Sequence, residues 1–156
     1  MNEMTVIYEN VLFREPDAGG LAFWSGILDS GLLNINQITQ VFQSSTEAMT
    51  VVDPIIRLYD GLFGRVPDYA GLAYWAGSGQ SLDQIVQGFL GTQEFANDYN
   101  GGTLGPIPAA NNAIFVQVLY EHMLGRLPDP AGLNCWVNIL GTHPTIASEA
   151  QVVEGI

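Results

Sequence analysis

Apolar residues recur along the chain at the spacing of amphipathic helices. A clear run is Ile55, Leu58, Tyr59, Leu62 and Phe63, which follow one another at i, i+3, i+4, i+7 and i+8 and so line one helix face. No segment alternates apolar and polar residues for long enough to predict a strand. The pattern therefore predicts an all-α protein.

One dodecamer is written three times, as FREPDAGGLAFW, GRVPDYAGLAYW and GRLPDPAGLNCW. Its tryptophans (Trp24, Trp75 and Trp136) lie 51 and then 61 residues apart, and a tyrosine stands eight residues before each motif proline. Repeats of this length predict stacked helical units that bury their faces against one another. We expect one compact domain with four parts, which are repeat 1 (1–52), repeat 2 (53–100), a loop insertion (101–113) and repeat 3 (114–156).

Each dodecamer predicts a helix–turn–helix with an Arg-x-Pro-Asp turn. The proline disfavours further helix before it, and the aspartate can cap the helix that follows. The arginine closes the preceding helix and is expected to pair with a carboxylate from a neighbouring helix. Glycine at the end of the preceding helix suits a left-handed residue, whereas Phe13 in repeat 1 predicts a less favourable end. The residues given structural roles are Arg14, Pro16, Asp17, Gly20, Trp24, Arg65, Pro67, Asp68, Gly71, Trp75, Arg126, Pro128, Asp129, Gly132 and Trp136.

Two features of the dodecamer predict close packing. Its inner glycine costs up to ~1 kcal/mol relative to alanine in a helix, which predicts that another backbone passes close by. Its tryptophan and leucine share one helix face, so the three tryptophans are expected to be buried anchors. Two alternatives stay open: the Arg/Asp pairs could bind an anionic ligand such as a sugar acid, and the aromatic residues could stack on sugars.

The charge balance narrows the range of partners. The chain has no lysine, four arginines and a formal net charge of −12. Such a chain repels nucleic-acid phosphates and anionic membrane surfaces, so neither is an expected partner. No run of apolar residues is long enough to span a membrane, and the start of the sequence has no signal-peptide pattern.

Side chains with reactive or ligating chemistry are few and scattered. Cys135 is the single cysteine and takes the position of Phe23 and Tyr74 in the other repeats, which predicts a half-buried packing role. Tyr69 and Tyr99 are the expected exposed aromatics.

Residue patterns typical of catalytic or metal-binding sites are equally few. His122 is expected to be exposed and His143 to lie in a turn, and neither belongs to a triad or zinc pattern. Five aspartates are candidates for calcium, but none forms a calcium-loop motif: Asp29, Asp53, Asp60, Asp83 and Asp98. The sequence predicts no enzyme, no catalytic residue, no metal site and no cofactor.

Repeat 3 is expected to be incomplete. QVVEGI aligns with QIVQGF of repeat 2, which places Ile156 on Phe89. We therefore expect a fragment of a longer protein, in which Val152, Val153 and Ile156 lack part of their apolar cover. The segment 97–112 is rich in Gly, Pro and Asn and is expected to be a loop.

The motif resembles a known family. A tyrosine, an LGR-type turn, Pro-Asp, Gly-Leu, an aromatic residue and Trp, followed by a Phe-x-x-Ser-x-Glu-like end, are similar to the bacterial "domain of unknown function 4214" repeats. That resemblance implies a large secreted or S-layer-like surface protein, often beside hemolysin-type calcium-binding repeats and exported by type I secretion. A weaker similarity runs to phycobilisome linker domains, which tend to be basic.

Three functional hypotheses follow. The preferred one is a non-catalytic structural or interaction module of a secreted or cell-surface bacterial protein, acting in assembly, anchoring or adhesion. Its partners would be neighbouring domains of a longer chain or copies of itself. The alternatives are a polysaccharide-binding module, with calcium as a candidate helper, and a scaffold like the phycobilisome linkers.

Overall fold

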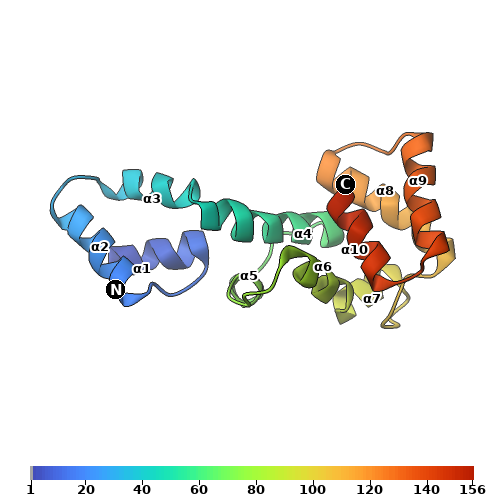
Figure 1. Ribbon diagram of the computed structural model, residues 1–156, viewed down its shortest axis with the longest axis horizontal. Helices are drawn as coiled ribbons and strands as arrows, with labels where there is room; N and C mark the ends of the chain where they lie inside the picture. The colour runs from blue at the N-terminus through green and yellow to red at the C-terminus, as the bar shows by residue number, and fades with distance from the viewer. Residues whose placement is uncertain (1) are drawn as a thin grey trace. The chain divides into compact units, whose positions relative to one another are not determined.

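The computed structural model describes residues 2–156, which form helices and connecting loops without a strand (Figure 1). The all-α fold with three repeat units is confirmed. In chain order the elements are α1 (Glu3–Ile7), the π-helical turn η1 (Tyr8–Leu12), α2 (Ala18–Asp29), α3 (Ile35–Gln43), the π-helical turn η2 (Ala48–Val52), α4 (Asp53–Phe63), α5 (Tyr69–Ala76), α6 (Leu82–Leu90), α7 (Gln93–Tyr99), the 3-10 turn η3 (Ala109–Asn111), α8 (Asn112–Leu124), α9 (Pro130–Thr142) and α10 (Ile146–Gly155).

Each repeat contributes three principal helices in the same order. They are α1 with η1, α2 and α3 in repeat 1, then α4, α5 and α6, and finally α8, α9 and α10. The second helix of each repeat begins directly after the motif aspartate, which is its N-cap, and this confirms the predicted helix–turn–helix. The aspartate carboxylates of Asp17, Asp68 and Asp129 accept the backbone N–H of the glycine three residues later, at 2.8, 2.7 and 2.9 Å.

The first helix of each repeat ends in a left-handed residue. Gly64 and Gly125 adopt φ of 60° and 64°, as predicted from their sequence positions. Phe13 lies at the equivalent position of repeat 1 with φ of 55°. Among residues 2–156 it is the one residue other than glycine that has a positive φ. A side chain with a Cβ is strained in this region, so the less favourable end predicted for repeat 1 is confirmed.

The contacts divide the chain into two compact units where the sequence was expected to form one domain. The first unit holds Met1–Ile56 and Pro67–Gly79, and the second holds Arg57–Val66 and Gln80–Ile156. The helices of repeat 2 are divided between the two units: α5 packs against η2 in the first unit, and α6 packs against α10 in the second. A repeat therefore does not bury its apolar faces only against itself.

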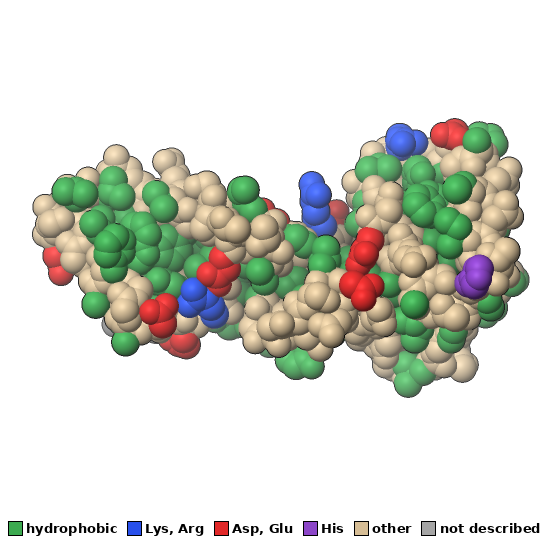
Figure 2. Space-filling view, in the orientation of Figure 1, with side chains coloured by type: hydrophobic (Ala, Val, Ile, Leu, Met, Phe, Trp, Pro, Cys, Tyr) green, Lys and Arg blue, Asp and Glu red, His purple; other side chains and the backbone are tan. Residues whose placement is uncertain are grey.

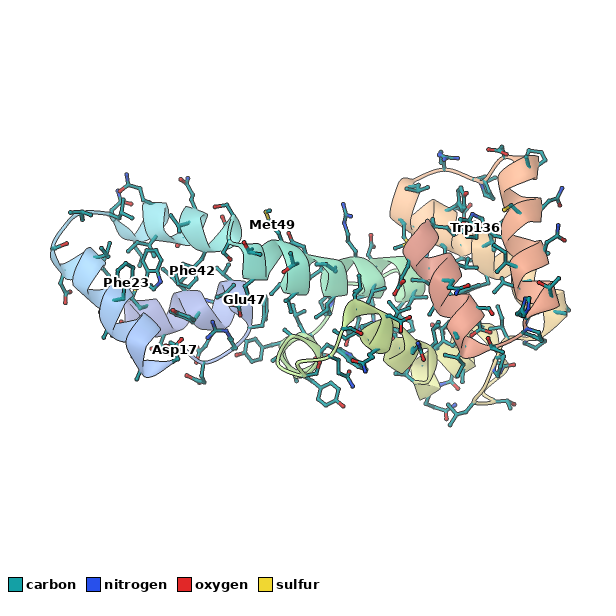
Figure 3. All side chains as sticks on the ribbon, in the orientation of Figure 1. Asp17, Phe23, Phe42, Glu47, Met49 and Trp136 are labelled. Carbon is teal, nitrogen blue, oxygen red and sulfur yellow. The ribbon has the colours of Figure 1, made fainter. Side chains whose placement is uncertain are left out.

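The first unit has a core between its first and third helices. Met4, Ile7, Tyr8, Ile38 and Phe42 are buried there. Figure 3 shows Phe42 directed into this interior and Met49 pointing away from the chain, where it is exposed. The apolar face of α3 is thus the face that builds the core.

Aromatic rings from α7 and α8 form the core of the second unit. Phe95 and Phe115 are fully buried, with ring centroids 5.8 Å apart, and the ring of Tyr99 lies 4.8 Å from Phe95 and 5.2 Å from Phe115. The two pairs with Phe115 are edge-to-face, and pairs of this kind add to the free energy of burial. The loop predicted at 97–112 is accordingly shorter, because α7 continues through Tyr99 and α8 begins at Asn112.

The expected loss of cover in repeat 3 does not occur at two of the three residues named for it. Val152 and Val153 are buried, while Ile156 is partly buried. The reason is that α10 packs against α6 of repeat 2 as well as against α9. Sequence alignment of single repeats could not foresee this partner.

Candidate functional site

The arginine of the motif is bound by a glutamate from a later helix in repeats 1 and 2. Arg14 Nε and Nη2 donate to the two carboxylate oxygens of Glu47 at 2.5 and 3.0 Å. Arg65 makes the same two-pronged contact with Glu94, at 2.7 Å for each bond. The predicted pairing of this arginine with a carboxylate of a neighbouring helix is thus confirmed for two repeats.

Each motif arginine also covers the motif tyrosine. The guanidinium carbons of Arg14, Arg65 and Arg126 lie 5.1, 4.9 and 5.2 Å from the ring centroids of Tyr8, Tyr59 and Tyr120. Cation–π contacts of this geometry are favourable, and they hold the turn against the first helix of the repeat.

Arg126 differs from its two counterparts in one respect. Among residues 2–156 it forms no ion pair, and its Nη1 contacts the carbonyl oxygen of Leu127 at 3.4 Å. Within the described residues, Arg126 therefore keeps the stacking on tyrosine without a carboxylate partner.

The electrostatics of the site follow from these bonds. The hydrogen bond with Glu47 raises the pKa of Arg14 above its usual value, and the backbone N–H of Gly20 lowers the pKa of Asp17. Burial raises the pKa of Tyr8. Arg14 and Asp17 are therefore held in their charged forms by local partners, which is the structural role assigned to them.

The tryptophans are partly buried, so the expectation that they are buried anchors is met only in part. Trp24 packs against the core of the first unit at 5.2 Å from Phe42, measured between ring centroids. Trp136 donates its Nε1–H to the hydroxyl of Tyr120 at 3.2 Å and lies against Gly155 of α10 (Figure 3). These tryptophans lie on surface helices, so one part of each ring meets the core while the rest stays at the surface.

The motif glycine makes room for a tyrosine hydroxyl, where a passing backbone had been expected. A Cβ on Gly20 would lie 2.3 Å from the hydroxyl oxygen of Tyr8, and one on Gly132 would lie 3.3 Å from that of Tyr120. The repeated tyrosine therefore packs its hydroxyl group against the repeated glycine, in repeats 1 and 3 alike. Their constant separation in the sequence was the signal for this packing.

The residue directly before the motif tryptophan is exposed in all three repeats. Phe23 is 60% exposed, Tyr74 is 69% exposed and Cys135 is exposed. The half-buried role expected for Cys135 is thus wrong, because this position faces away from the tryptophan's packing side. Phe23 and Tyr74 each stand edge-on to the adjacent tryptophan, with ring centroids 5.2 and 5.0 Å apart.

Of the two tyrosines expected to be exposed, one is and one is not. Tyr69 is 52% exposed, and its ring centroid lies 5.8 Å from that of Phe13. Tyr99 is buried, and its hydroxyl donates to the carbonyl oxygen of Leu62 at 2.5 Å. Burial raises the pKa of Tyr99. The last turn of α7, part of which was expected to lie in the loop 97–112, carries Tyr99 into the core.

A small hollow lies beside the ion pair of repeat 1. It has a volume of about 170 Å³, and Arg14, Glu47, Trp24 and Val41 are among the residues that line it. In the labelled view, Glu47 extends from the end of the α3 region and Asp17 stands at the start of α2 (Figure 3). The hollow combines an aromatic ring with charged hydrogen-bonding groups.

The aspartates that were candidates for calcium are spread over four helices. Asp29 ends α2, Asp53 and Asp60 belong to α4, Asp83 to α6 and Asp98 to α7. Within residues 2–156 no three His, Cys, Asp or Glu side chains are grouped closely enough to hold a metal ion. His122 and His143 are both exposed, and His122 Nδ1 lies 3.1 Å from the carbonyl oxygen of Gly61.

The buried carboxylate of Glu149 was not predicted from the sequence. Its Oε1 accepts the backbone N–H of Ile107 at 2.6 Å, and its Oε2 has no hydrogen-bond partner. Burial raises the pKa of this carboxyl group. Glu149 thereby fixes the inserted loop, whose Ile107 is also buried, onto α10.

These observations define a class: an all-α protein in which three copies of one helical repeat build the structure. A family profile described as "Domain of unknown function (DUF4214)" matches residues 4–52, 53–99 and 108–156. The chain belongs to this family, as its motif predicted. Comparison with curated proteins and with solved structures gave no match. Among residues 2–156, no helix has both the length and the apolar character that crossing a membrane requires.

Proposed function

We propose that this chain is a non-catalytic structural and interaction module of a secreted or cell-surface bacterial protein, where it serves assembly, anchoring or adhesion. The observation that carries the proposal is the use made of the repeated polar residues. Arg14 and Arg65 bind Glu47 and Glu94, and the three motif aspartates cap helices. The repeated motif is thus occupied in holding the fold, which leaves function to the surfaces that the repeats present.

Those surfaces are rich in apolar groups. Large apolar side chains with exposures above one third include Leu32, Met49, Val66, Leu104 and Leu127. Figure 2 shows apolar side chains gathered on the visible face over the N-terminal helices. Apolar side chains gathered on one face, as over the N-terminal helices, are typical of sites that contact other proteins. The module would act without a cofactor, and its partners would be neighbouring domains or copies of itself.

A polysaccharide-binding role is the second candidate, and a specific observation favours it. The exposed rings of Phe23 and Tyr74 stand beside tryptophans, and the hollow at Arg14 and Glu47 adjoins Trp24. Exposed aromatic faces can stack on the apolar faces of sugars, and the charged pair could hydrogen-bond hydroxyl groups.

Calorimetric titration with purified bacterial envelope polysaccharide separates the two roles. The interaction module predicts no saturable glycan binding and a measurable association with protein partners. The matched variants are Phe23→Ala with Tyr74→Ala, and Cys135→Ala as the control at the same position of repeat 3. Saturable glycan binding that the double variant loses and the control keeps would overturn the preferred role in favour of the second.

A further inference from the structure

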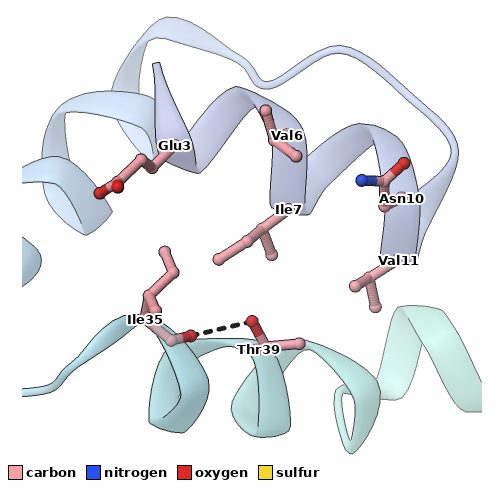
Figure 4. Close-up of a pocket in the computed structure, with 7 residues that line it drawn as sticks. All are labelled: Glu3, Val6, Ile7, Asn10, Val11, Ile35 and Thr39. Atoms are coloured by element: carbon pink, nitrogen blue, oxygen red, sulfur yellow. Dashed lines mark hydrogen bonds between the residues drawn. The ribbon is translucent and has the colours of Figure 1, made fainter. Parts of the chain in front are cut away.

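An open groove runs along the first repeat. It has a volume of about 320 Å³ and lies between the helix formed by α1 with η1 and the facing side of α3 (Figure 4). Val6, Ile7, Asn10 and Val11 line one wall, and Ile35 and Thr39 line the other. Apart from the buried Ile7, these side chains are partly or fully exposed, so an apolar surface is left open to solvent.

Many of the same repeat positions are covered in repeats 2 and 3, which both contribute them to the second unit. Gly61, Leu62, Val86 and Val153 are buried, whereas Arg57, Leu82 and His122, at other positions of the same face, are exposed. Counted from the motif tyrosine, Asn10 corresponds to Gly61 and to His122, and Val11 corresponds to Leu62 and to Met123. A Cβ on Gly61 would lie 2.7 Å from Met123 Cγ, and His122 Nδ1 lies 3.1 Å from the carbonyl oxygen of Gly61. The first helices of the two repeats therefore cross at this position.

The third helices of repeats 2 and 3 meet in the same way. Helix α10 packs against α6, and Val86 and Val153, which correspond to Thr39, are both buried. Thus part of each wall of the groove in repeat 1 has counterparts that are in contact between repeats 2 and 3, at Gly61 with Met123 and along α6 with α10. The second unit shows what covers this face of a repeat: the equivalent face of another repeat.

We propose that repeat 1 binds a second copy of this chain through this groove, face to face and with two-fold symmetry, as repeats 2 and 3 pair within one chain. The proposal rests on the proposed interaction role and names its partner. A two-fold interface brings a patch against its own copy, so each groove would cover the other. Val6, Val11 and Ile35 would supply the apolar contact.

The polar residues of the groove suit this partner. Asn10 stands where the paired helices of repeats 2 and 3 cross, so the Asn10 side chains of the two copies would meet, and an amide can both donate to and accept from a second amide. Glu3 lies seven residues away along the helix, roughly 10 Å from the crossing, on opposite sides in the two copies. The two carboxylates are therefore kept apart.

Sedimentation equilibrium of the whole chain over a wide concentration range tests the proposal. We expect a reversible dimer, and Asn10→Arg should raise its dissociation constant at least about ten-fold by placing two positive charges at the crossing. Gln40→Arg adds the same charge at an exposed position of α3 outside the groove and should leave the dissociation constant within about two-fold. Circular dichroism of each variant verifies that it is folded.

Mixing variants tests the two-fold geometry. Asn10→Arg and Asn10→Glu should each be monomeric alone and should form a mixed dimer together, because the two charges then attract. A chain that stays monomeric at all concentrations overturns the inference. So does a dimer that Asn10→Arg leaves intact, although that result keeps the proposed interaction role. Failure of the mixture to associate would overturn the face-to-face pairing, and saturable glycan binding by a monomer would overturn both proposals.

Discussion

Repeat 1 and repeat 3 carry the same motif, but one position on the equivalent face of their first helix is exposed in repeat 1 and buried in repeat 3. Phe115 of α8 is fully buried, whereas Glu3, at the equivalent position of repeat 1, is exposed at the rim of an open groove. The tyrosine, arginine and aspartate of the two repeats make nearly the same local contacts. The motif therefore determines how a repeat folds, and the residues on its outer faces determine what covers it.

Removing the ring of Phe115 should have the largest effect on stability. Phe115→Ala leaves a cavity beside Phe95 and Tyr99 and should lower the free energy of unfolding by ~3–5 kcal/mol. Glu3→Ala, at the equivalent position of repeat 1, should change it by less than about 1 kcal/mol. Urea unfolding followed by circular dichroism measures both, and equal losses would contradict the difference in burial.

Adding a methyl group at the motif glycine should separate the same two repeats. In Gly20→Ala the new Cβ would lie 2.3 Å from the hydroxyl oxygen of Tyr8, and the resulting overpacking should cost ~1–3 kcal/mol. In Gly132→Ala the nearest atom is the hydroxyl oxygen of Tyr120 at 3.3 Å, which has to shift by much less, and alanine has the higher helix propensity, so the loss of stability should be clearly smaller than in Gly20→Ala. Thermal unfolding of the two variants gives the comparison, and equal losses would show that Tyr8 yields freely.

Glu149 should make stability depend on pH. It takes the position of Ile35 and Leu82, and burial raises its pKa in the folded protein above the value in the unfolded chain. The folded state then binds the proton more tightly, so this group favours folding below the unfolded value of about 4.5, and that contribution is lost as the pH rises through the folded pKa.

Glu149→Gln should remove this dependence while keeping an acceptor for Ile107. We expect the variant to be more stable than the parent at neutral pH, by about 1–2 kcal/mol for a buried charge with an unpaired oxygen, and the two to converge in acid. Guanidinium unfolding at pH 4 and pH 7 tests the sign. A variant that is less stable than the parent at pH 7 would show that the charged form is the one that the fold favours.

The ion pair of the motif should contribute least. Arg14→Gln removes both the contact with Glu47 and the stacking on Tyr8, whereas Arg126→Gln removes only the stacking. The difference between the two losses should be ~0.2–1 kcal/mol, because the Arg14 pair is about one third exposed. High salt should reduce that difference, and an unchanged difference in 1 M salt would argue against an ionic origin.

Local features of this protein could be predicted from its sequence because their physical causes are local. The helix caps at Asp17, Asp68 and Asp129 depend on residues three positions apart, and the left-handed ends depend on one residue each. The repeat spacing was sufficient to predict three helical units and the family. For Arg14, the sequence predicted a carboxylate partner on a neighbouring helix but not which one, since Glu47 lies 33 residues further along the chain.

Tertiary structure alone decided which surfaces are covered. Nothing in the motif indicates that α10 packs against α6, that Tyr99 enters a core, or that Glu149 is buried beneath the inserted loop. It also decided that the tryptophans keep one side at the surface while Phe23 and Tyr74 stay open. The physical reason is that burial depends on the partner of a helix face, and a partner from another repeat can be any face of suitable shape, whereas a cap or a turn depends on immediate neighbours in the chain.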